Sequence, residues 1–323
     1  MKTVSATSRS AASTTHQVPL IASIMAFSAG LVWSLGTLTA RLADGSDAWQ
    51  YLIWRSIGIV IVMEIFSHVR GRGWMTIRAF NQGPIMLLGT FGLMLASLAY
   101  VYAVKNTTAA NAAFLASVTP LFAVVLSRIF LGERLNKITI GAMVLALFGL
   151  AITVVGDLQG GNMIGNISAL FSSLGFAIYT VCVRSEPNHD WSPILPGYAV
   201  AMIVLCSTVT LIGGSSLAPP AKDIGYALLH GALLIVVGTI LFNIGSRTVP
   251  AVAMTILAQS EMAFAPFWIF LFLGERPSGW SLLGGAVILT AVIGKAALDA
   301  RPQPLLPHDD VLEPAPDTGP AAV

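Results

Sequence analysis

Charged residues are scarce in this chain. Of its 323 residues, 10% are charged and 55% are hydrophobic, and the mean hydropathy is +0.80. A soluble globular protein carries about 25% charged residues, so 15 acidic and 17 basic side chains are too few to cover a water-facing surface. The apolar residues also fall in blocks of about 20, the length of helix that crosses roughly 30 Å of hydrocarbon. The composition therefore predicts an all-α integral membrane protein.

The motifs of several enzyme and pump classes are absent from the sequence. It contains no G-x-x-x-x-G-K-[ST] phosphate loop and no H-E-x-x-H zinc motif. The two cysteines, Cys182 and Cys206, stand singly in apolar runs without metal-ligand spacing. The net charge of +2 gives no support to nucleic-acid binding. We therefore expect no cofactor, no metal, no nucleic-acid partner and no enzymatic activity.

Apolar blocks separated by charged or turn residues predict ten transmembrane helices. The connections between them are short, so no soluble domain is inserted. The flanking segments 1–19 and 299–323 are rich in small polar residues and in proline respectively, and we expect both to be disordered cytoplasmic tails. The predicted spans cover residues 20–41, 50–69, 84–104, 108–130, 138–156, 163–183, 194–212, 224–243, 250–272 and 279–298.

The distribution of lysine and arginine predicts the orientation. With a cytoplasmic N-terminus, the 17 basic residues divide into 12 on the inside and 4 on the outside, which leaves Arg55 within the second span. Cytoplasmic loops of membrane proteins carry such an excess. We therefore expect a multi-pass protein of the cytoplasmic (inner) membrane with both termini in the cytoplasm.

Two segments of the chain resemble each other at an offset of 142 residues. When KNTTAANAAFLASVTPLFAVVLSRIFLGER (105–134) is aligned with RTVPAVAMTILAQSEMAFAPFWIFLFLGER (247–276), ten of the 30 positions agree. The sequence thus predicts two five-helix repeats, 20–156 and 163–298. Five is odd, so the second repeat enters the membrane inverted. Inverted repeats are typical of secondary transporters, although duplication can also build a large bundle, as in some channels.

These features resemble the EamA-type ten-helix members of the drug/metabolite transporter superfamily. The resemblance covers residues 20–298 and rests on the five-plus-five arrangement, on PLFAVVLSRIFLGERL, on the second FLGER and on Arg55. In the second repeat Met262 takes the place of Pro120, so the kink geometry of the ninth span does not follow from the resemblance. The resemblance implies proton-coupled or facilitated movement of small organic solutes across the bilayer, more often outward. It does not carry over the substrate.

Glu261 is the most informative single residue. It lies near the middle of the predicted span 250–272, where a charged side chain costs about 2.5–3.5 kcal/mol to insert. Such a side chain must face the bundle interior or a wet cavity. We expect it to exchange a proton or to bind a cationic group of the solute. A protonated structural carboxyl, bonded to a neighbouring helix, is the alternative.

Arg55 lies about six residues into the second span. It could snorkel to the interface, form an ion pair, or hold a substrate carboxylate with two parallel hydrogen bonds. For His230, the sequence is compatible with a structural role and with binding of a proton or substrate. Tyr100 fits either a stacking box for the solute or an interfacial aromatic belt. Further substrate contacts are expected from polar and aromatic positions on spans that face each other. These are Trp33, Asn111, Thr119, Tyr179 and Gln259.

The sequence therefore predicts a secondary transporter that exports an amino acid or related amphipathic metabolite. Alternating access would use a central cavity between spans 1, 3, 4, 6, 8 and 9, with Glu261 as the protonation or cation-binding group. The alternatives are an uptake permease for a vitamin- or nucleoside-like solute, and a membrane-embedded enzyme or scaffold. Substrate identity, direction, coupling ion and oligomeric state do not follow from the sequence.

Overall fold

A computed structural model of the chain describes residues 20–107, 112, 115–133, 136–157, 163–274 and 279–299. All regular structure in these ranges is helical. Apart from Asp299, both predicted tails lie outside them. In chain order the helices are α1 (Leu20–Leu42), α2 (Ala48–Val69), α3 (Met75–Phe80), α4 (Pro84–Asn106), α6 (Thr119–Phe130), α7 (Lys137–Asp157), α8 (Met163–Ser185), α9 (Ile194–Ile212), α10 (Ala221–Leu229), the π-helix η1 (His230–Ile235), α11 (Val236–Gly245), α12 (Ala251–Ala258), α13 (Ser260–Leu273) and α14 (Gly279–Asp299).

Seven helical stretches in the described ranges are long and apolar enough to cross a membrane. They are α1, α2, α4, α8 and α9, together with 221–245 and 251–273, which each join more than one helix. The other three predicted spans coincide with shorter apolar helices at 119–130, 137–152 and 282–295. The prediction of a multi-pass helical membrane protein is confirmed, and the count of ten spans stays a prediction.

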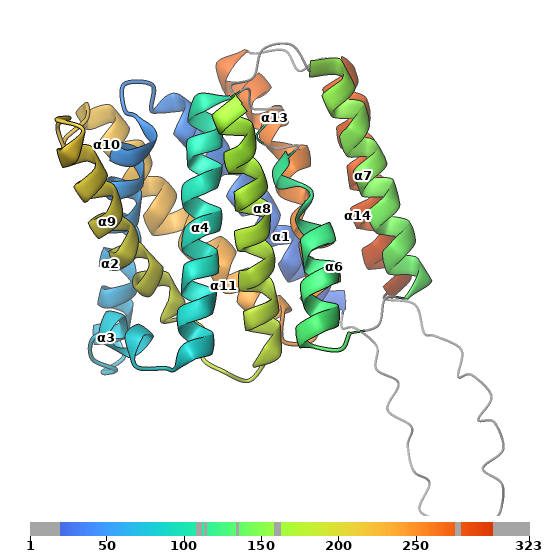
Figure 1. The fold of residues 1–323 in the computed structure, drawn as a ribbon, viewed down its shortest axis with the longest axis horizontal. Coiled ribbons are helices and arrows are strands. Elements are labelled where there is room, and N and C mark those ends of the chain that lie inside the picture. The colour runs from blue at the N-terminus through green and yellow to red at the C-terminus, as the bar shows by residue number, and fades with distance from the viewer. Residues whose placement is uncertain are drawn as a thin grey trace, which may run out of the picture.

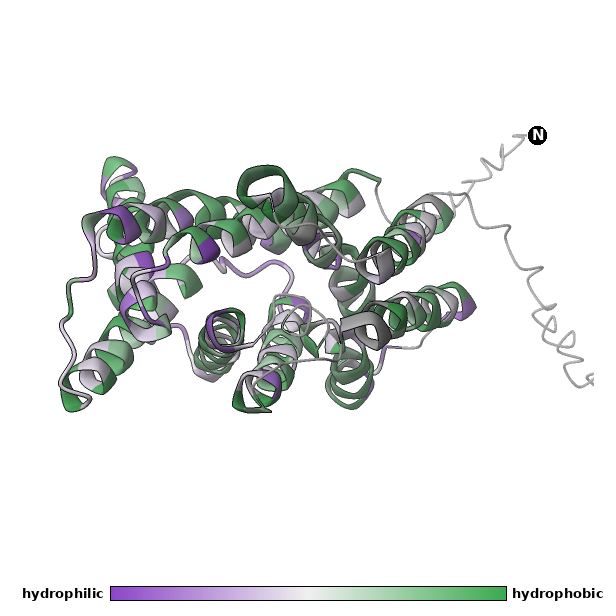
Figure 2. Ribbon diagram, turned by 90° about the horizontal axis from the view of Figure 1, so that it is seen from above, coloured by the Kyte–Doolittle hydropathy of each residue, from purple (hydrophilic) through white to green (hydrophobic). Residues whose placement is uncertain are grey.

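Large apolar side chains point away from the bundle. Ile129, Phe148 and Ile212, for example, are all more than 60% exposed. Figure 2 shows that most residues along the helices are hydrophobic. A water-soluble protein avoids apolar surface on this scale, whereas hydrocarbon requires it.

Helices from the two predicted repeats pack against each other in corresponding pairs. α4 packs on α8 and α1 packs on α11, while α2 packs on α9 and α7 on α14. The α7–α14 pair forms one edge of the bundle in Figure 1. In the predicted repeat, α1 corresponds to α8, and α4 corresponds to the stretch that contains α11. The α4–α8 contact is therefore equivalent to the α1–α11 contact. In the α2–α9 and α7–α14 contacts, each helix packs against its own equivalent in the other half.

Small residues allow the α4–α8 contact. A Cβ atom added to Gly175 would lie 2.6 Å from the backbone nitrogen of Ala96 and 2.7 Å from the carbonyl oxygen of Gly92. Small side chains let helix backbones approach closely where no hydrophobic driving force acts between helices. Glycine at these positions is therefore what brings the two halves together along α4 and α8.

Two spans are broken at positions that correspond in the repeat. In the second half, a turn at Gln259 separates α12 from α13, and in the first half a turn at Ser117 and Val118 precedes α6. Pro120 lies in the first turn of α6, where its missing N–H costs no helical hydrogen bond. Gln259 donates from Nε2 to the carbonyl oxygen of Ser117, 142 residues earlier, at 3.1 Å. The two broken spans therefore meet at their breaks.

Candidate functional site

A cavity lies between the two halves of the bundle. Helices α1, α2, α4 and α6 line it from the first half, and α8, α9, η1, α11, α12 and α13 line it from the second. Its volume is about 120 Å³, room for roughly four water molecules at about 30 Å³ each. Most of the wall is apolar, with a few polar groups that converge on the space, as is usual for ligand sites. All six spans predicted to enclose a cavity contribute to this one, and so do α2 and α9.

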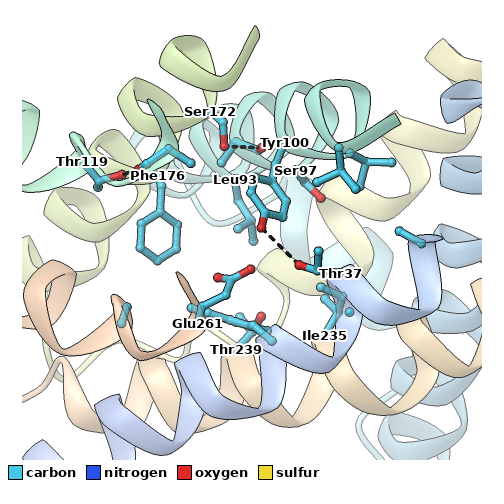
Figure 3. Close-up of a pocket in the computed structure, with 18 of the residues that line it drawn as sticks. Thr37, Leu93, Ser97, Tyr100, Thr119, Ser172, Phe176, Ile235, Thr239 and Glu261 are labelled. Atoms are coloured by element: carbon cyan, nitrogen blue, oxygen red, sulfur yellow. Dashed lines mark hydrogen bonds between the residues drawn. The ribbon is translucent and has the colours of Figure 1, made fainter. Parts of the chain in front are cut away.

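Glu261 lies in the cavity wall. It stands in the first turn of α13, directly after the break at Gln259, and its side chain is partly accessible. In Figure 3 its carboxyl group points toward the α4 side of the cavity, between Phe176 and Tyr100. The first turn of a helix is a favourable place for an anion, because unpaired N–H groups carry partial positive charge there. The acid thus faces the cavity between the two halves of the bundle rather than lipid.

Tyr100 is a polar partner of this carboxyl. Its phenol interacts with Glu261 and lies 3.1 Å from the hydroxyl of Thr37 on α1. From the sequence alone, Tyr100 fits both a stacking box and an interfacial belt, because it lies close to the end of α4. The available signal was its helical register, since Leu93, Ser97 and Val104 on the same face of α4 also line the cavity.

Arg55 also lies in the cavity wall, inside the bundle. Its side chain is 2% exposed, so it does not snorkel to the interface. The Nη2 group donates to the hydroxyl of Ser97 on α4, and Nε has no hydrogen-bond partner. Within the part of the chain that the structure describes, no carboxylate lies within ion-pair distance of Arg55.

A buried hydrogen-bond chain starts at the cavity with His230. This residue begins the π-helix η1, and its Nδ1 lies 2.8 Å from the hydroxyl oxygen of Tyr51. The Tyr51 hydroxyl lies 3.0 Å from that of Thr39. Gly36 makes room for the imidazole, because a Cβ atom there would lie 2.3 Å from Nε2. Single turns of π-helix are frequent at functional sites. The sequence carried no signal for Tyr51, since a tyrosine near a helix end is ordinary at an interface.

Trp33, Thr119 and Gln259 line the cavity as well. Trp33 packs against the rings of Phe176 and Phe242, with centroids 5.6 and 5.5 Å away, and its Nε1 has no hydrogen-bond partner. Thr119 donates to the carbonyl oxygen of Ala116 on its own span, 2.7 Å away. Gln259 keeps its buried Oε1 without a donor. Their contacts with a substrate stay predictions.

One other predicted contact residue, Tyr179, stands apart from the cavity. Tyr179 is fully buried, donates its hydroxyl proton to the side chain of Asn243 and stacks on Phe242 at 5.6 Å. It supports the aromatic cluster but is not among the residues that line the cavity. Asn111 lies outside the described residues. The structure therefore brings together Trp33, Arg55, Thr119, Gln259 and Glu261, and it adds Tyr100, Ser97 and His230.

Comparison with known proteins decides the family. The EamA-like transporter family matches residues 20–155 and again residues 163–295. The chain belongs to the EamA-like transporter family. Because the match spans nearly all of the helical part, this family membership applies to the whole bundle. The protein is a transporter by family and a multi-pass membrane protein by its helices.

Individual relatives of this EamA-like chain are named as exporters or transporters. A pseudopaline exporter of Pseudomonas aeruginosa is 26% identical over 221 residues, which are 66% of this chain and 75% of that protein. A probable terminal-alkyne amino-acid exporter of Streptantibioticus cattleyicolor is 23% identical and covers 67% of this chain and 73% of its own length. An uncharacterized transporter of Bacillus subtilis is 26% identical, with 80% of each chain covered.

The fold is also found among solved structures. One crystal structure aligns with a TM-score of 0.69 and 19% sequence identity, and the match covers 86% of this chain and 97% of the solved one. At this identity the likeness shows the fold alone.

Proposed function

We propose that this protein is a secondary transporter of the cytoplasmic membrane that exports a small amphipathic solute by alternating access. One observation carries the proposal: Glu261 lies in the wall of a cavity that both halves of the chain enclose. Family membership and the names of the exporters among the relatives support a transport function and an outward direction.

The mechanism rests on two inverted five-helix repeats with ten spans and cytoplasmic termini. The corresponding helix pairs and the hydrogen bond between the repeat-equivalent residues Gln259 and Ser117 support the duplication. Broken helices that meet near the middle of the bundle are a frequent feature of transporter sites. Rocking of one half against the other would then expose the cavity to each side of the membrane in turn.

Glu261 supplies the coupling in this mechanism. When the cavity is empty, its carboxyl carries a proton, because an isolated charge in a mostly apolar wall is costly. When the cationic group of a solute enters, the proton leaves and a charge-assisted hydrogen bond forms. Proton and solute therefore exclude each other, and an inward proton gradient drives the solute out. The titratable and charged groups that share the cavity with Glu261 are Tyr100 on α4, Arg55 on α2, Tyr198 on α9 and His230 on η1.

Other predicted residues contribute contacts rather than coupling. Trp33 offers an aromatic surface and an unused indole N–H, and Gln259 offers an unused carbonyl oxygen. Thr119 borders the space at the start of α6. Tyr179 holds the aromatic cluster in place through Phe242, and Asn111 stays a predicted contact.

Export from liposomes tests the proposal. Purified protein is reconstituted into liposomes loaded with standard amino acids and with amines and carboxylic acids of matched side chains. Loss of each compound is followed by mass spectrometry, with and without an acidic exterior. We expect the wild type to release a subset faster than protein-free liposomes, and faster still under the pH gradient.

A pair of variants separates the coupling from the fold. Glu261→Gln should lose the gradient-dependent part of export, because an amide cannot exchange a proton. Glu186→Gln makes the same change in the loop after α8, away from the cavity, and should behave as the wild type. Gradient-driven export by Glu261→Gln at the wild-type rate would contradict the coupling role. Release of no compound by the wild type would contradict the transport function.

A further inference from the structure

We infer that Arg55 binds the carboxylate of the solute, so that the cargo is a zwitterion of the amino-acid class with its amino group at Glu261. This inference rests on the proposed function and names the chemistry that the same cavity recognises. It is carried by a buried guanidinium that has no carboxylate within ion-pair distance among the described residues.

Arg55 is a buried cation with no anionic partner in the part of the chain that the structure describes. At 2% exposure its guanidinium is out of reach of bulk solvent, and its bond to Ser97 supplies a neutral acceptor only. Arginine is almost never fully buried unless it is paired, because removing its charge from water costs several kcal/mol. Its Nε has no acceptor at all. A guanidinium with unused donors in a cavity wall matches a carboxylate, which accepts two parallel hydrogen bonds from it.

The acidic group of the same cavity lies apart from this cation. Among the described residues that line the cavity, Arg55 is the only lysine or arginine and Glu261 the only aspartate or glutamate, and the two are not within ion-pair distance of each other. A simple amine would satisfy Glu261 and leave Arg55 unpaired, while a simple carboxylate would do the reverse. A zwitterion satisfies both groups at once.

The spacing of the two charges suits a small zwitterion. Both rest against one helix, α4: Arg55 bonds Ser97, and Glu261 interacts with Tyr100. These two anchor residues are three positions apart, which is about 4.5 Å of helical rise on a single face. Figure 3 shows Ser97, Tyr100 and Glu261 around one space. The carboxylate and ammonium groups of one amino acid, which share a carbon atom, can therefore reach both charges together.

The remaining wall accepts an apolar side chain. Trp33 and Phe176 form an edge-to-face pair with centroids 5.6 Å apart, and both line the cavity. Figure 3 shows Phe176 beside Glu261. Aromatic surfaces of this kind bind apolar or aromatic groups by area and by ring geometry. We therefore expect apolar and aromatic amino acids to be preferred over charged ones.

Matched compounds test the assignment in the liposome assay. Within each of two sets, the three compounds share a side chain. One set is phenylalanine, phenethylamine and 3-phenylpropionate, and the other is leucine, isopentylamine and 4-methylpentanoate. We expect export of the amino acid in each set to exceed that of the amine and of the acid by at least about tenfold, the factor of one charge-assisted hydrogen bond. Export of an amine or acid at the rate of its amino acid would overturn the inference while leaving the transport function intact. Export of none of the six would contradict the transport function itself.

Variants at position 55 separate binding from folding. Arg55→Gln should lower amino-acid export at least about tenfold, and Arg55→Lys, which keeps the charge without the planar fork, should lower it less. Arg128→Gln makes the same change on the exposed surface of α6 and should leave export unchanged. The thermal unfolding of detergent-solubilised protein is measured for each variant, with and without phenylalanine. We expect phenylalanine to raise the melting temperature of the wild type and not that of Arg55→Gln. Equal protection of both would overturn the role of Arg55.

Discussion

Glu133 joins the two halves of the chain through Arg184. Its Oε1 lies 3.1 Å from Nε of Arg184, at the end of α8, and its Oε2 accepts the backbone N–H of Ala251, at the start of α12, at 3.2 Å. Arg184 donates in turn to the carbonyl oxygen of Arg247 at 3.0 Å. Glu133 belongs to the first of the two LGER motifs, so the motif fastens one repeat to two elements of the other. Any motion that opens the cavity at this end must first separate these groups.

Glu133→Gln should loosen that end of the bundle. The amide keeps one hydrogen bond but loses the charge, and a partly exposed ion pair contributes at most about 1 kcal/mol. We expect faster backbone hydrogen exchange in the last turn of α8 and the first turn of α12, with a small fall in melting temperature. Exchange in α7 serves as the internal control. Unchanged exchange at both helix ends would contradict the bridging role of Glu133.

Gly175→Ala should destabilise the contact between α4 and α8. Its new Cβ atom would lie 2.6 Å and 2.7 Å from backbone atoms of α4, which cannot move aside as a side chain can. Overpacking of this kind costs about 1–3 kcal/mol. Gly225→Ala in α10 is the matched control, because nothing lies within 4 Å of the added atom. Alanine there should stabilise the helix by about 0.5–1 kcal/mol, and equal melting temperatures for the two variants would contradict the packing argument.

Tyr51→Phe should cost about 1–3 kcal/mol of stability. The change leaves the Nδ1 of His230 and the hydroxyl of Thr39 buried without their shared partner. Tyr226→Phe on α10 removes a phenolic hydroxyl from a less buried ring and is the control. Thermal unfolding in detergent compares the two proteins. A melting temperature for Tyr51→Phe as high as that of the control would show that the chain from His230 to Thr39 does not stabilise the fold.

Asp190 makes a pH-dependent contact at the loop between α8 and α9. Its Oδ2 accepts a hydrogen bond from Nη2 of Arg78 on α3 at 3.1 Å, and Nη1 of Arg72 lies 4.0 Å from the same oxygen. Partial burial disfavours the charged form, but the hydrogen bonds from Ser192 and Arg78 outweigh it and hold the pKa of Asp190 below its usual range. Because the pKa of Asp190 is lower in the folded state than in the unfolded state, its ionised carboxylate stabilises the fold. This contribution is fully present above the unfolded pKa of about 3.9, and it is lost as the pH falls through the lower pKa of the folded state.

Asp190→Asn tests this contact by a pH series. The carboxylate is 41% exposed, so screening limits its contribution to at most about 1 kcal/mol. The wild type should melt slightly higher than the variant near pH 6, and the two curves should converge as the pH falls below the usual range of aspartate. A constant gap between the curves at all values of pH would contradict the electrostatic origin of the difference.

Much of the site was open to prediction from the sequence because insertion into a membrane is a local property. The position of Glu261 in the middle of a span predicts that it faces the bundle interior, and it lies in the wall of the cavity. Polar and aromatic groups in spans gather at interiors, which predicts Trp33, Thr119 and Gln259 as contacts, and all three border the same space. The same reasoning predicts Tyr179, which packs behind the wall, because periodicity does not say how a helix is rotated about its axis.

The sequence is sufficient to predict a helical membrane protein, two halves that resemble each other, and one acid that must face inward. These follow from composition, segment length and the cost of a charge in hydrocarbon, which depend on no distant contact. The packing of the helices established that Arg55 has no carboxylate within ion-pair distance among the described residues, that Tyr100 interacts with Glu261, and that His230 bonds Tyr51 from 179 positions away. Such neighbours depend on how apolar helices rotate and pack, and a helix that is apolar on every side carries no pattern that specifies it.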